Sequence, residues 1–359
     1  MSRLTTRLAA LAAASTVAVL ATAPAQADTF VLRVAAGWPT AALQVVNQTQ
    51  KHFVPTVTKR VAAETKHTVR FIEGYGGTIA NLFEVLESTE KGLADFGVVC
   101  ACFEPTKLFA HNYPYFIPYV SGDPHVAGPV GRQLYKEFAF LPGILEKDYN
   151  QIVLGNPATD DYGLGTSFAW TKAEELKGKK IGAAGPNLPW LEFAGATPVQ
   201  TNLNEVYNNL QSGVYQGVVI FPTPYNSLKF YEPAKYYTEM GWNSVTVVPL
   251  TVNKKSWEKL PADVQKVILS VAAEWETVTE KAYADGYATA LDALRKAGTT
   301  VRALPQEERA ILAKQTEPWV NTRAGELEAQ GHPGKALYRR FIELSEQKGA
   351  KLAYKYQIK

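Results

Sequence analysis

Aromatic side chains recur where the first predicted strands of this sequence end. Trp38, Tyr75 and Phe103 each stand at or just after the end of a predicted strand, and Glu73 stands beside Tyr75. In open α/β sheets ligands bind at the carboxyl ends of strands. Aromatic walls suit a ring that can stack or a cationic ammonium group. We therefore predict that these four residues contact a small ligand.

The middle of the chain repeats this pattern with a second aromatic set. Phe221 ends a predicted strand, and Tyr162, Trp190 and Tyr225 stand close to other predicted strand ends. Asn187, Thr223 and the Tyr162 hydroxyl supply hydrogen bonds that suit hydroxyl groups of a neutral or phenolic ligand. The predicted ligand contacts from this half are Tyr162, Asn187, Trp190, Phe221, Thr223 and Tyr225.

Three acidic residues stand at predicted loop ends and bear on the charge of the ligand. Glu73, Asp160 and Asp161 would favour an amine or ammonium ligand if they face the site. The alternative is that they are ordinary solvated loop residues, as most carboxylates are.

The sequence lacks the motifs of common catalytic and metal sites. It has no Gly-x-Ser-x-Gly elbow, and the glycine cluster at 74–77 lacks the Lys-Ser/Thr of a nucleotide-binding loop. The five histidines show no spacing typical of metal ligands. We predict a protein that is not an enzyme, with no metal and no cofactor.

Only two cysteines occur, Cys100 and Cys102. Both fall in a predicted strand, so their side chains would project in parallel from one face. Such positions lie roughly 6 to 7 Å apart, which suits a disulfide badly. We expect two small buried residues without a bond between them.

Strands alternating with helices predict α/β units with a mainly parallel sheet. The expected strands cover residues 29–35, 68–72, 96–103, 180–183, 217–221 and 246–252, and the expected helices cover 43–61, 79–91, 189–194 and 203–212.

A much longer helix is predicted from 262 to 296. No proline interrupts this stretch, its apolar residues recur with helical spacing, and Gly298 stops it. At 1.5 Å per residue it would be roughly 50 Å long, longer than one domain is wide. We expect it to brace two lobes, with the tail 305–359 packed outside the second.

The first residues read as a secretory signal peptide cut after Ala27. Arg3 and Arg7 precede an apolar run that closes with Ala-Gln-Ala, and that run is shorter than a membrane span. Its removal takes away two of the 37 Lys and Arg residues and none of the 34 Asp and Glu residues, which leaves a net charge near +1. We predict a periplasmic protein without a nucleic-acid partner.

Several segments in consistent order resemble the solute-binding proteins of TRAP transporters. The stretch 175–181, Glu-Leu-Lys-Gly-Lys-Lys-Ile, resembles the family signature, and matching pieces follow at 195–199, 204–214, 229–232 and 253–261. The resemblance spans essentially the whole mature chain. It implies a hinged protein that delivers a small organic solute to the small and large membrane subunits of a sodium-driven transporter.

One departure from that family affects the predicted ligand. The arginine that usually follows the Lys-Ile of the signature, and that clamps a ligand carboxylate, is replaced by Gly182. A second usual arginine is missing near Tyr162, and Ile220 replaces a usual asparagine. We therefore predict an aromatic, neutral or cationic ligand at a site that includes Gly182. A carboxylate held by another cation, from Arg70, Lys107 or Lys172, is the alternative.

The fold class that we predict is α/β, a two-lobed periplasmic binding protein fold in a monomer. The predicted signal peptide is 1–27, the first lobe 28–161 with about 246–288, and the second lobe 162–245 with about 289–359. A receptor read by a membrane sensor and a binding protein of another transporter class are the remaining alternatives.

Overall fold

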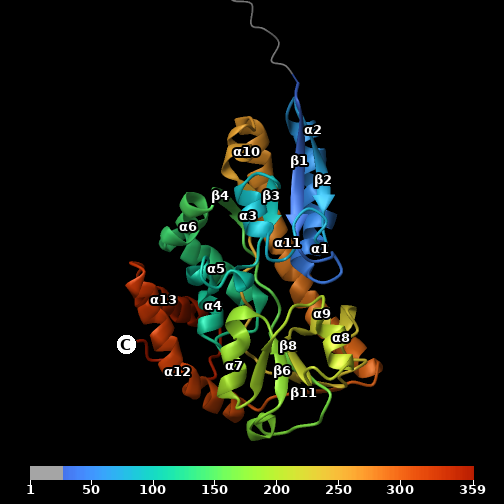
Figure 1. Cartoon of the computed structure of the whole chain (residues 1–359). Helices are drawn as coiled ribbons and strands as arrows, with labels where there is room; N and C mark the ends of the chain where they lie inside the picture. Colours follow the sequence, from blue (N-terminus) through green and yellow to red (C-terminus); the bar gives the residue numbers. More distant parts are fainter. Residues whose placement is uncertain (1–26) are drawn as a thin grey trace, which may run out of the picture.

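The computed structural model describes residues 27–359, so the predicted signal peptide lies almost wholly outside the described residues. The described chain forms two lobes, each built on one β-sheet with helices around it (Figure 1). This arrangement confirms the predicted two-lobed α/β fold.

The sheet of the first lobe has five strands in the order β2-β1-β3-β10-β4. The strands β2, β1 and β3 run parallel, whereas β10 is antiparallel to both of its neighbours. The sheet is thus completed by a strand that returns from far along the chain. Its strands are β1 (Thr29–Ala36), β2 (Thr68–Gly74), β3 (Phe96–Val98), β4 (Gln151–Gly155) and β10 (Leu250–Asn253).

The sheet of the second lobe has six strands in the order β11-β9-β5-β8-β6-β7. The strand β5 is antiparallel to β8 and β9, and the other pairs are parallel. Both sheets are therefore mixed. The strands are β5 (Gly163–Thr166), β6 (Lys180–Ala183), β7 (Thr197–Gln200), β8 (Gly217–Ile220), β9 (Tyr236–Glu239) and β11 (Thr300–Ala303).

Helices cover the sheets and connect the lobes. The long helix α11 has 35 residues and runs from the upper lobe to the lower one (Figure 1). It packs against α1 and α2 of the first lobe and against α9 and β11 of the second. The predicted long helix is confirmed, and it begins and ends at the predicted residues 262 and 296. The helices are α1 (Gln44–Gln48), α2 (Val54–Glu64), α3 (Val85–Glu90), α4 (Tyr113–Phe116), α5 (Pro124–Glu137), α6 (Phe140–Asp148), α7 (Leu188–Phe193), α8 (Val206–Gln211), α9 (Pro222–Ser227), α10 (Lys254–Glu258), α11 (Ala262–Lys296), α12 (Gln306–Ala329) and α13 (Gly334–Gln347).

The predicted helix 43–61 forms in two pieces. A π-helical stretch, Thr49–Phe53, separates α1 from α2. Pro55, the second residue of α2, has no N–H to donate to the preceding turn, so a regular α-helical ladder cannot continue through it. The proline explains the wider turn.

The predicted strand 96–103 is wrong beyond Val98, and so is the expectation for its cysteines. The chain leaves the strand and forms a 3-10 turn, Ala101–Phe103, in which Cys102 N donates to Cys100 Sγ. This turn brings the two Cα atoms to 5.1 Å, and the cysteines form a disulfide. An extended strand would hold the two side chains parallel and too far apart for a disulfide, and the turn removes that geometry.

The strand expected at 246–252 begins only at Leu250. Residues 240–249 have no regular secondary structure although most of them are buried. The Asn243 side chain forms hydrogen bonds with backbone groups of the neighbouring segment 114–121. It accepts from Val120 N and Ser121 N, and it donates to Pro114 O and Ile117 O. Side-chain hydrogen bonds replace a sheet ladder here.

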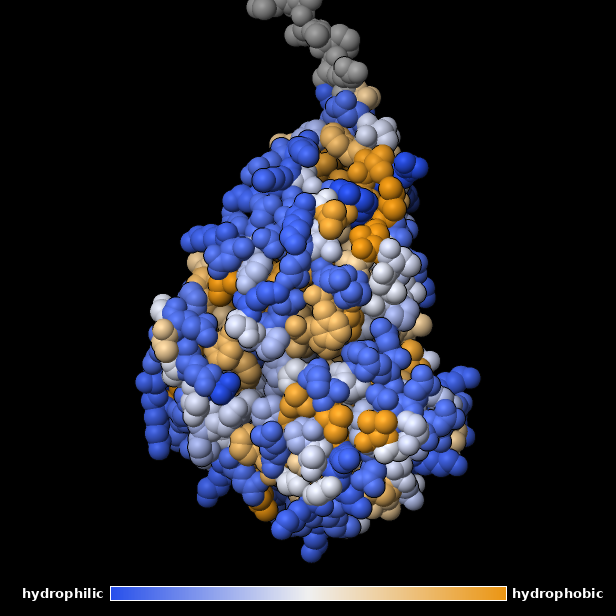
Figure 2. All heavy atoms as spheres, viewed as in Figure 1, coloured by the Kyte–Doolittle hydropathy of each residue, from blue (hydrophilic) through white to orange (hydrophobic). Residues whose placement is uncertain are grey.

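The visible surface is mainly hydrophilic in Figure 2, with apolar colour gathered over β1 and β2 in the upper lobe. Val31 on β1 and Ile72 on β2 are both exposed there. None of the helices found between residues 27 and 359 combines the length and the apolarity that a membrane crossing needs.

Candidate functional site

A cavity lies between the two lobes, at the carboxyl ends of strands from both sheets. It encloses about 580 Å³ of space not filled by protein atoms, its open mouth included. Residues after β1 and β3 line it from the first lobe, and residues at the ends of β6, β7 and β8 line it from the second. The lining residues are Trp38, Leu43, Cys100, Cys102, Phe103, Tyr115, Thr159, Tyr162, Ala183, Ala184, Asn187, Thr201, Asn202, Leu203, Val206, Val218, Val219, Ile220, Phe221, Val247 and Val248.

Aromatic rings form opposing parts of this wall. Trp38 and Phe103 pack together in the first lobe with ring centroids 5.8 Å apart. Tyr162 and Phe221 pack edge-on with centroids 5.0 Å apart. Tyr115 joins the second group, since its hydroxyl lies 3.0 Å from the Tyr162 hydroxyl. A flat ligand entering between the lobes therefore meets rings on both sides.

Every side chain that lines the cavity is uncharged at neutral pH. Burial raises the pKa of the Tyr115 hydroxyl and that of the Tyr162 hydroxyl, so both keep their protons. The remaining polar lining groups are amides, hydroxyls and the Trp38 indole. The cavity can hold a ligand by packing and neutral hydrogen bonds.

Two polar lining residues are already held in place by neighbours. Asn187 accepts from Ala184 N at 2.9 Å through its Oδ1. Thr201 Oγ1 lies 3.0 Å from the Tyr215 hydroxyl. By contrast, the Trp38 Nε1 is buried and lacks a hydrogen-bond partner anywhere in residues 27–359.

Gly182 sits on β6 behind the cavity wall. It is paired with Val199 and Val218 in the sheet. A Cβ atom added there would stand 2.9 Å from the Tyr215 ring and 3.0 Å from Thr201 Cγ2. Tyr215 and Thr201 thus fill the space that a larger side chain would need.

The structure brings five of the predicted site residues together in the cavity, namely Trp38, Phe103, Tyr162, Asn187 and Phe221. Six others lie elsewhere. Glu73 is exposed at the end of β2 and Tyr75 is half-buried beside it. Gly182, Trp190, Thr223 and Tyr225 do not line the cavity.

Trp190 forms the layer directly behind the Tyr115 and Tyr162 rings. Its ring stacks on Trp242 at 5.4 Å, and its Nε1 donates to Tyr115 O at 2.8 Å. Tyr225 is fully buried, and its hydroxyl donates to Ala234 O. These side chains support the cavity wall without lining it.

Sequence reasoning missed lining residues of two kinds. Ala183 and Ala184 stand at the end of a predicted strand, so the rule that identified Phe221 would also have found them. Tyr115 lies in the short helix α4, and Val247 lies in a segment without regular secondary structure; neither stands at the end of a predicted strand. Cys100 and Cys102 line the cavity because the chain turns after β3.

Two buried carboxyl groups lie on the segment that crosses between the lobes. Asp160 is fully buried, and neither of its carboxyl oxygens has a partner of normal hydrogen-bond geometry in the described chain, although Thr223 lies close by. Burial raises the pKa of Asp160 well above its usual value and raises that of Asp161 to about 7, while Arg309 partly opposes the latter shift. Neither residue lines the cavity.

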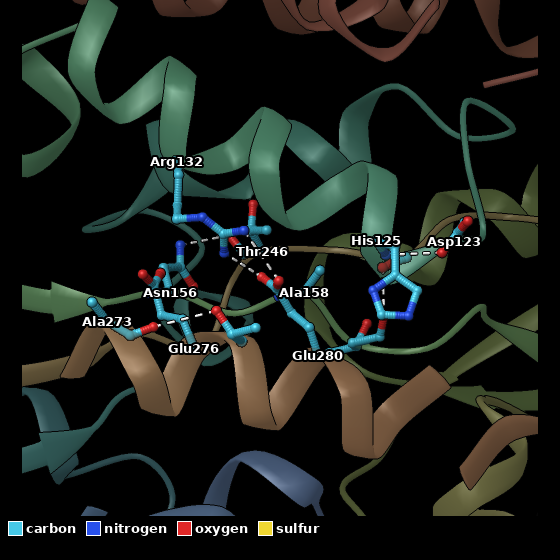
Figure 3. Close-up of polar contacts among 12 residues, drawn as sticks. Asp123, His125, Arg132, Asn156, Ala158, Thr246, Ala273, Glu276 and Glu280 are labelled. Atoms are coloured by element: carbon cyan, nitrogen blue, oxygen red, sulfur yellow. Dashed lines mark hydrogen bonds and ion pairs between the residues drawn. The ribbon is translucent and has the colours of Figure 1, made fainter. Parts of the chain in front are cut away.

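The same crossing segment is tied to α11 by two glutamates (Figure 3). Glu276 accepts from Asn156 N at 2.6 Å, and burial raises the pKa of its carboxyl. Glu280 pairs with Arg132 of α5 at 2.5 Å and accepts from Ala158 N at 3.4 Å. Charge-assisted bonds therefore fix the point where the chain passes from β4 toward β5.

The model of a family of bacterial extracellular solute-binding proteins, family 7 (DctP), matches residues 166–325. A solute-binding protein of Sulfitobacter is 36% identical over 103 residues, which cover 28% of this chain and 31% of that protein. The ectoine/5-hydroxyectoine-binding periplasmic protein UehA of Ruegeria pomeroyi is 24% identical over 94% of this chain and 92% of its own length.

Solved structures share the fold over nearly the whole described chain. A TRAP solute-binding protein from a marine metagenome, specific for aromatic acid ligands and solved with 3-hydroxybenzoate, superposes with a TM-score of 0.78. It is 20% identical, and the match covers 90% of this chain and 100% of that one.

Proposed function

We propose that the chain is a TRAP-type extracellular solute-binding protein, which captures a small organic solute between its lobes and presents it to the small and large membrane subunits of a TRAP transporter. The observation that carries this proposal is the cavity, which residues of both lobes line at the carboxyl ends of their strands.

The proposed mechanism is hinged closure. Segments 156–162 and 240–249 cross between the lobes, and α11 runs along both. A ligand that contacts both walls stabilises the closed form by the contacts that it lacks in the open one. The closed surface is then what the membrane subunits bind.

The proposed lobes are 28–161 with about 246–288, and 162–245 with about 289–359. The two sheets support this division, because β10 joins the first sheet and β11 joins the second. We propose a mature chain that starts near Asp28 and acts in the periplasm as a monomer. The Ruegeria pomeroyi relative, which is named as a periplasmic protein, supports this location.

We also propose that the protein binds its ligand without converting it. All lining side chains are neutral, and the two lining tyrosines whose pKa values are raised hold their protons at neutral pH. General acid–base catalysis needs a group that exchanges a proton near the working pH. Conversion of a bound compound by the purified protein would contradict this assignment.

Replacing Phe221 with alanine tests whether the cavity is the binding site. Phe221 lines the cavity, and loss of its packing should weaken ligand binding by roughly tenfold or more, as loss of an aromatic contact does. Phe193→Ala in α7 is the matched control, since that ring packs against Trp319 outside the cavity. Titration calorimetry with the tightest compound from a solute panel gives the comparison. Equal affinity of both variants and the wild type would refute the assignment.

A further inference from the structure

We propose that the ligand is an uncharged ring compound bearing a hydrogen-bond acceptor, and that the cavity selects against carboxylates. This inference rests on the proposed function and concerns the ligand class of the same cavity. It differs from the aromatic acid bound by the marine metagenome protein, and it narrows the choice among neutral, cationic and anionic ligands.

The first support is the charge of the wall. All lining side chains are neutral, so an ionised ligand group would lose its hydration without gaining an opposite charge. Burying an unpaired ion costs several kcal/mol even after the protein relaxes. A neutral ring loses little hydration and gains packing against Trp38, Phe103, Tyr162 and Phe221.

The second support is that the alternative cations are engaged or distant from the cavity. Lys107 pairs with Glu87 and Glu104 on the outside of the first lobe. Arg70 and Lys172 have exposed side chains. None of these three residues therefore replaces the missing arginine as a partner for a ligand carboxylate.

The third support is the structure around Gly182. The Tyr215 ring and Thr201 occupy the space next to its Cα, and their hydroxyls lie 3.0 Å apart. This arrangement replaces a cationic clamp with a packed, neutral wall. An arginine could not be accommodated there unless the Tyr215 ring moved.

The fourth support identifies the polar feature of the ligand. Trp38 lines the cavity and is 4% exposed, and its Nε1–H has no acceptor within the described chain. A buried donor left without a partner costs about 1 to 3 kcal/mol, which a ligand acceptor would recover. An indole N–H only donates, so the ligand atom must be an acceptor such as a carbonyl or ether oxygen.

The Tyr115 and Tyr162 pair offers a second donor to the cavity. The Tyr115 and Tyr162 hydroxyls lie 3.0 Å apart, so one donates to the other. The accepting hydroxyl keeps its own proton for another acceptor. A ring compound with one or two neutral oxygen atoms fits both donors.

The test compares ring compounds of one size that differ in charge. Benzamide, acetophenone and benzyl alcohol are the neutral probes, benzoate is the anionic probe, and benzylamine is the cationic probe at pH 7. Thermal shift followed by calorimetry should give binding of at least one neutral probe about tenfold tighter than either ion, since about 1.4 kcal/mol corresponds to tenfold. Tighter binding of benzoate or benzylamine than of every neutral probe would overturn the proposal.

Trp38→Phe tests the predicted donor because it keeps a ring and removes the N–H. It should weaken binding of the preferred neutral probe about tenfold. Trp257→Phe in α10 serves as the matched control, because it also removes an indole N–H and Trp257 does not line the cavity. Unchanged affinity of the folded Trp38→Phe protein would refute the donor role.

The outcome also separates this inference from the proposed function. If benzoate or a dicarboxylate binds tightly and makes the protein more compact in small-angle scattering, the solute-binding function stands and the ligand class is wrong. If no neutral or charged probe binds, the inference is refuted. If, in addition, no small molecule accompanies the protein in native mass spectrometry after purification from the periplasm, the proposed function is refuted too.

Discussion

Glu280→Gln should destabilise the protein strongly, because Glu280 ties the crossing segment to α11. Its side chain is 4% exposed, and it receives two guanidinium N–H bonds from Arg132 at 2.5 and 3.2 Å. It also accepts from Ala158 N at 3.4 Å. Removing one partner of a buried ion pair costs about 3 to 5 kcal/mol. Arg132 is 31% exposed and can regain some hydration, so we expect a loss of about 2 to 4 kcal/mol.

Urea unfolding of Glu280→Gln and of a control on the same helix measures this effect. Glu274 on α11 pairs with Arg60 at 2.6 Å, but the side chains of both residues are partly exposed. Exposed ion pairs contribute about 0 to 1 kcal/mol to the free energy of unfolding. Glu274→Gln should therefore change the free energy of unfolding by less than about 1 kcal/mol. Equal effects of the two variants, or a loss below about 0.5 kcal/mol for Glu280→Gln, would refute the role assigned to this pair.

Two further predictions concern buried groups near the cavity. Trp190→Ala should lower the free energy of unfolding by about 3 to 5 kcal/mol, since it removes a fully buried ring stacked on Trp242; a loss under about 1 kcal/mol in urea titrations would contradict its placement behind the wall. The pKa of Asp161 rises to about 7 on folding, so the native state binds more protons than the unfolded state between about pH 4 and pH 7, and stability falls as pH rises through that window. Asp161→Asn should therefore raise Tm relative to the wild type more at pH 8 than at pH 5, and an equal difference at both pH values would refute the shift.

Much of the fold follows from local patterns in the sequence. The ends of α11 were predictable because an uninterrupted apolar period ends at a glycine. The strand β6 was predictable because a turn motif precedes it. These elements carry their signals within a few neighbouring residues.

Other features depend on contacts that a local pattern does not contain. The turn at Ala101–Phe103 is held by Ala101 N donating to Val247 O and by the Asn112 side chain donating to Ala101 O. Because these partners are distant in sequence, the early end of β3 and the disulfide of Cys100 and Cys102 were not predictable. The rule for strand ends found the aromatic residues nearest the cavity. This rule could not separate Phe221 in the lining from Trp190 one layer behind, since both stand at or close to predicted strand ends.

The central claim, that the lobes close on a solute, is tested most directly by a distance between them. Spin labels can be attached at Glu84→Cys in the first lobe and at Glu205→Cys in the second, because both positions are exposed. The native cysteines are bonded to each other and do not take up the label. Pulsed electron paramagnetic resonance measures the distance between the two labels. We expect a shorter, narrower distribution of this distance with saturating ligand and a longer, broader one without it. The same distribution in both samples, with binding verified by calorimetry, would contradict the account.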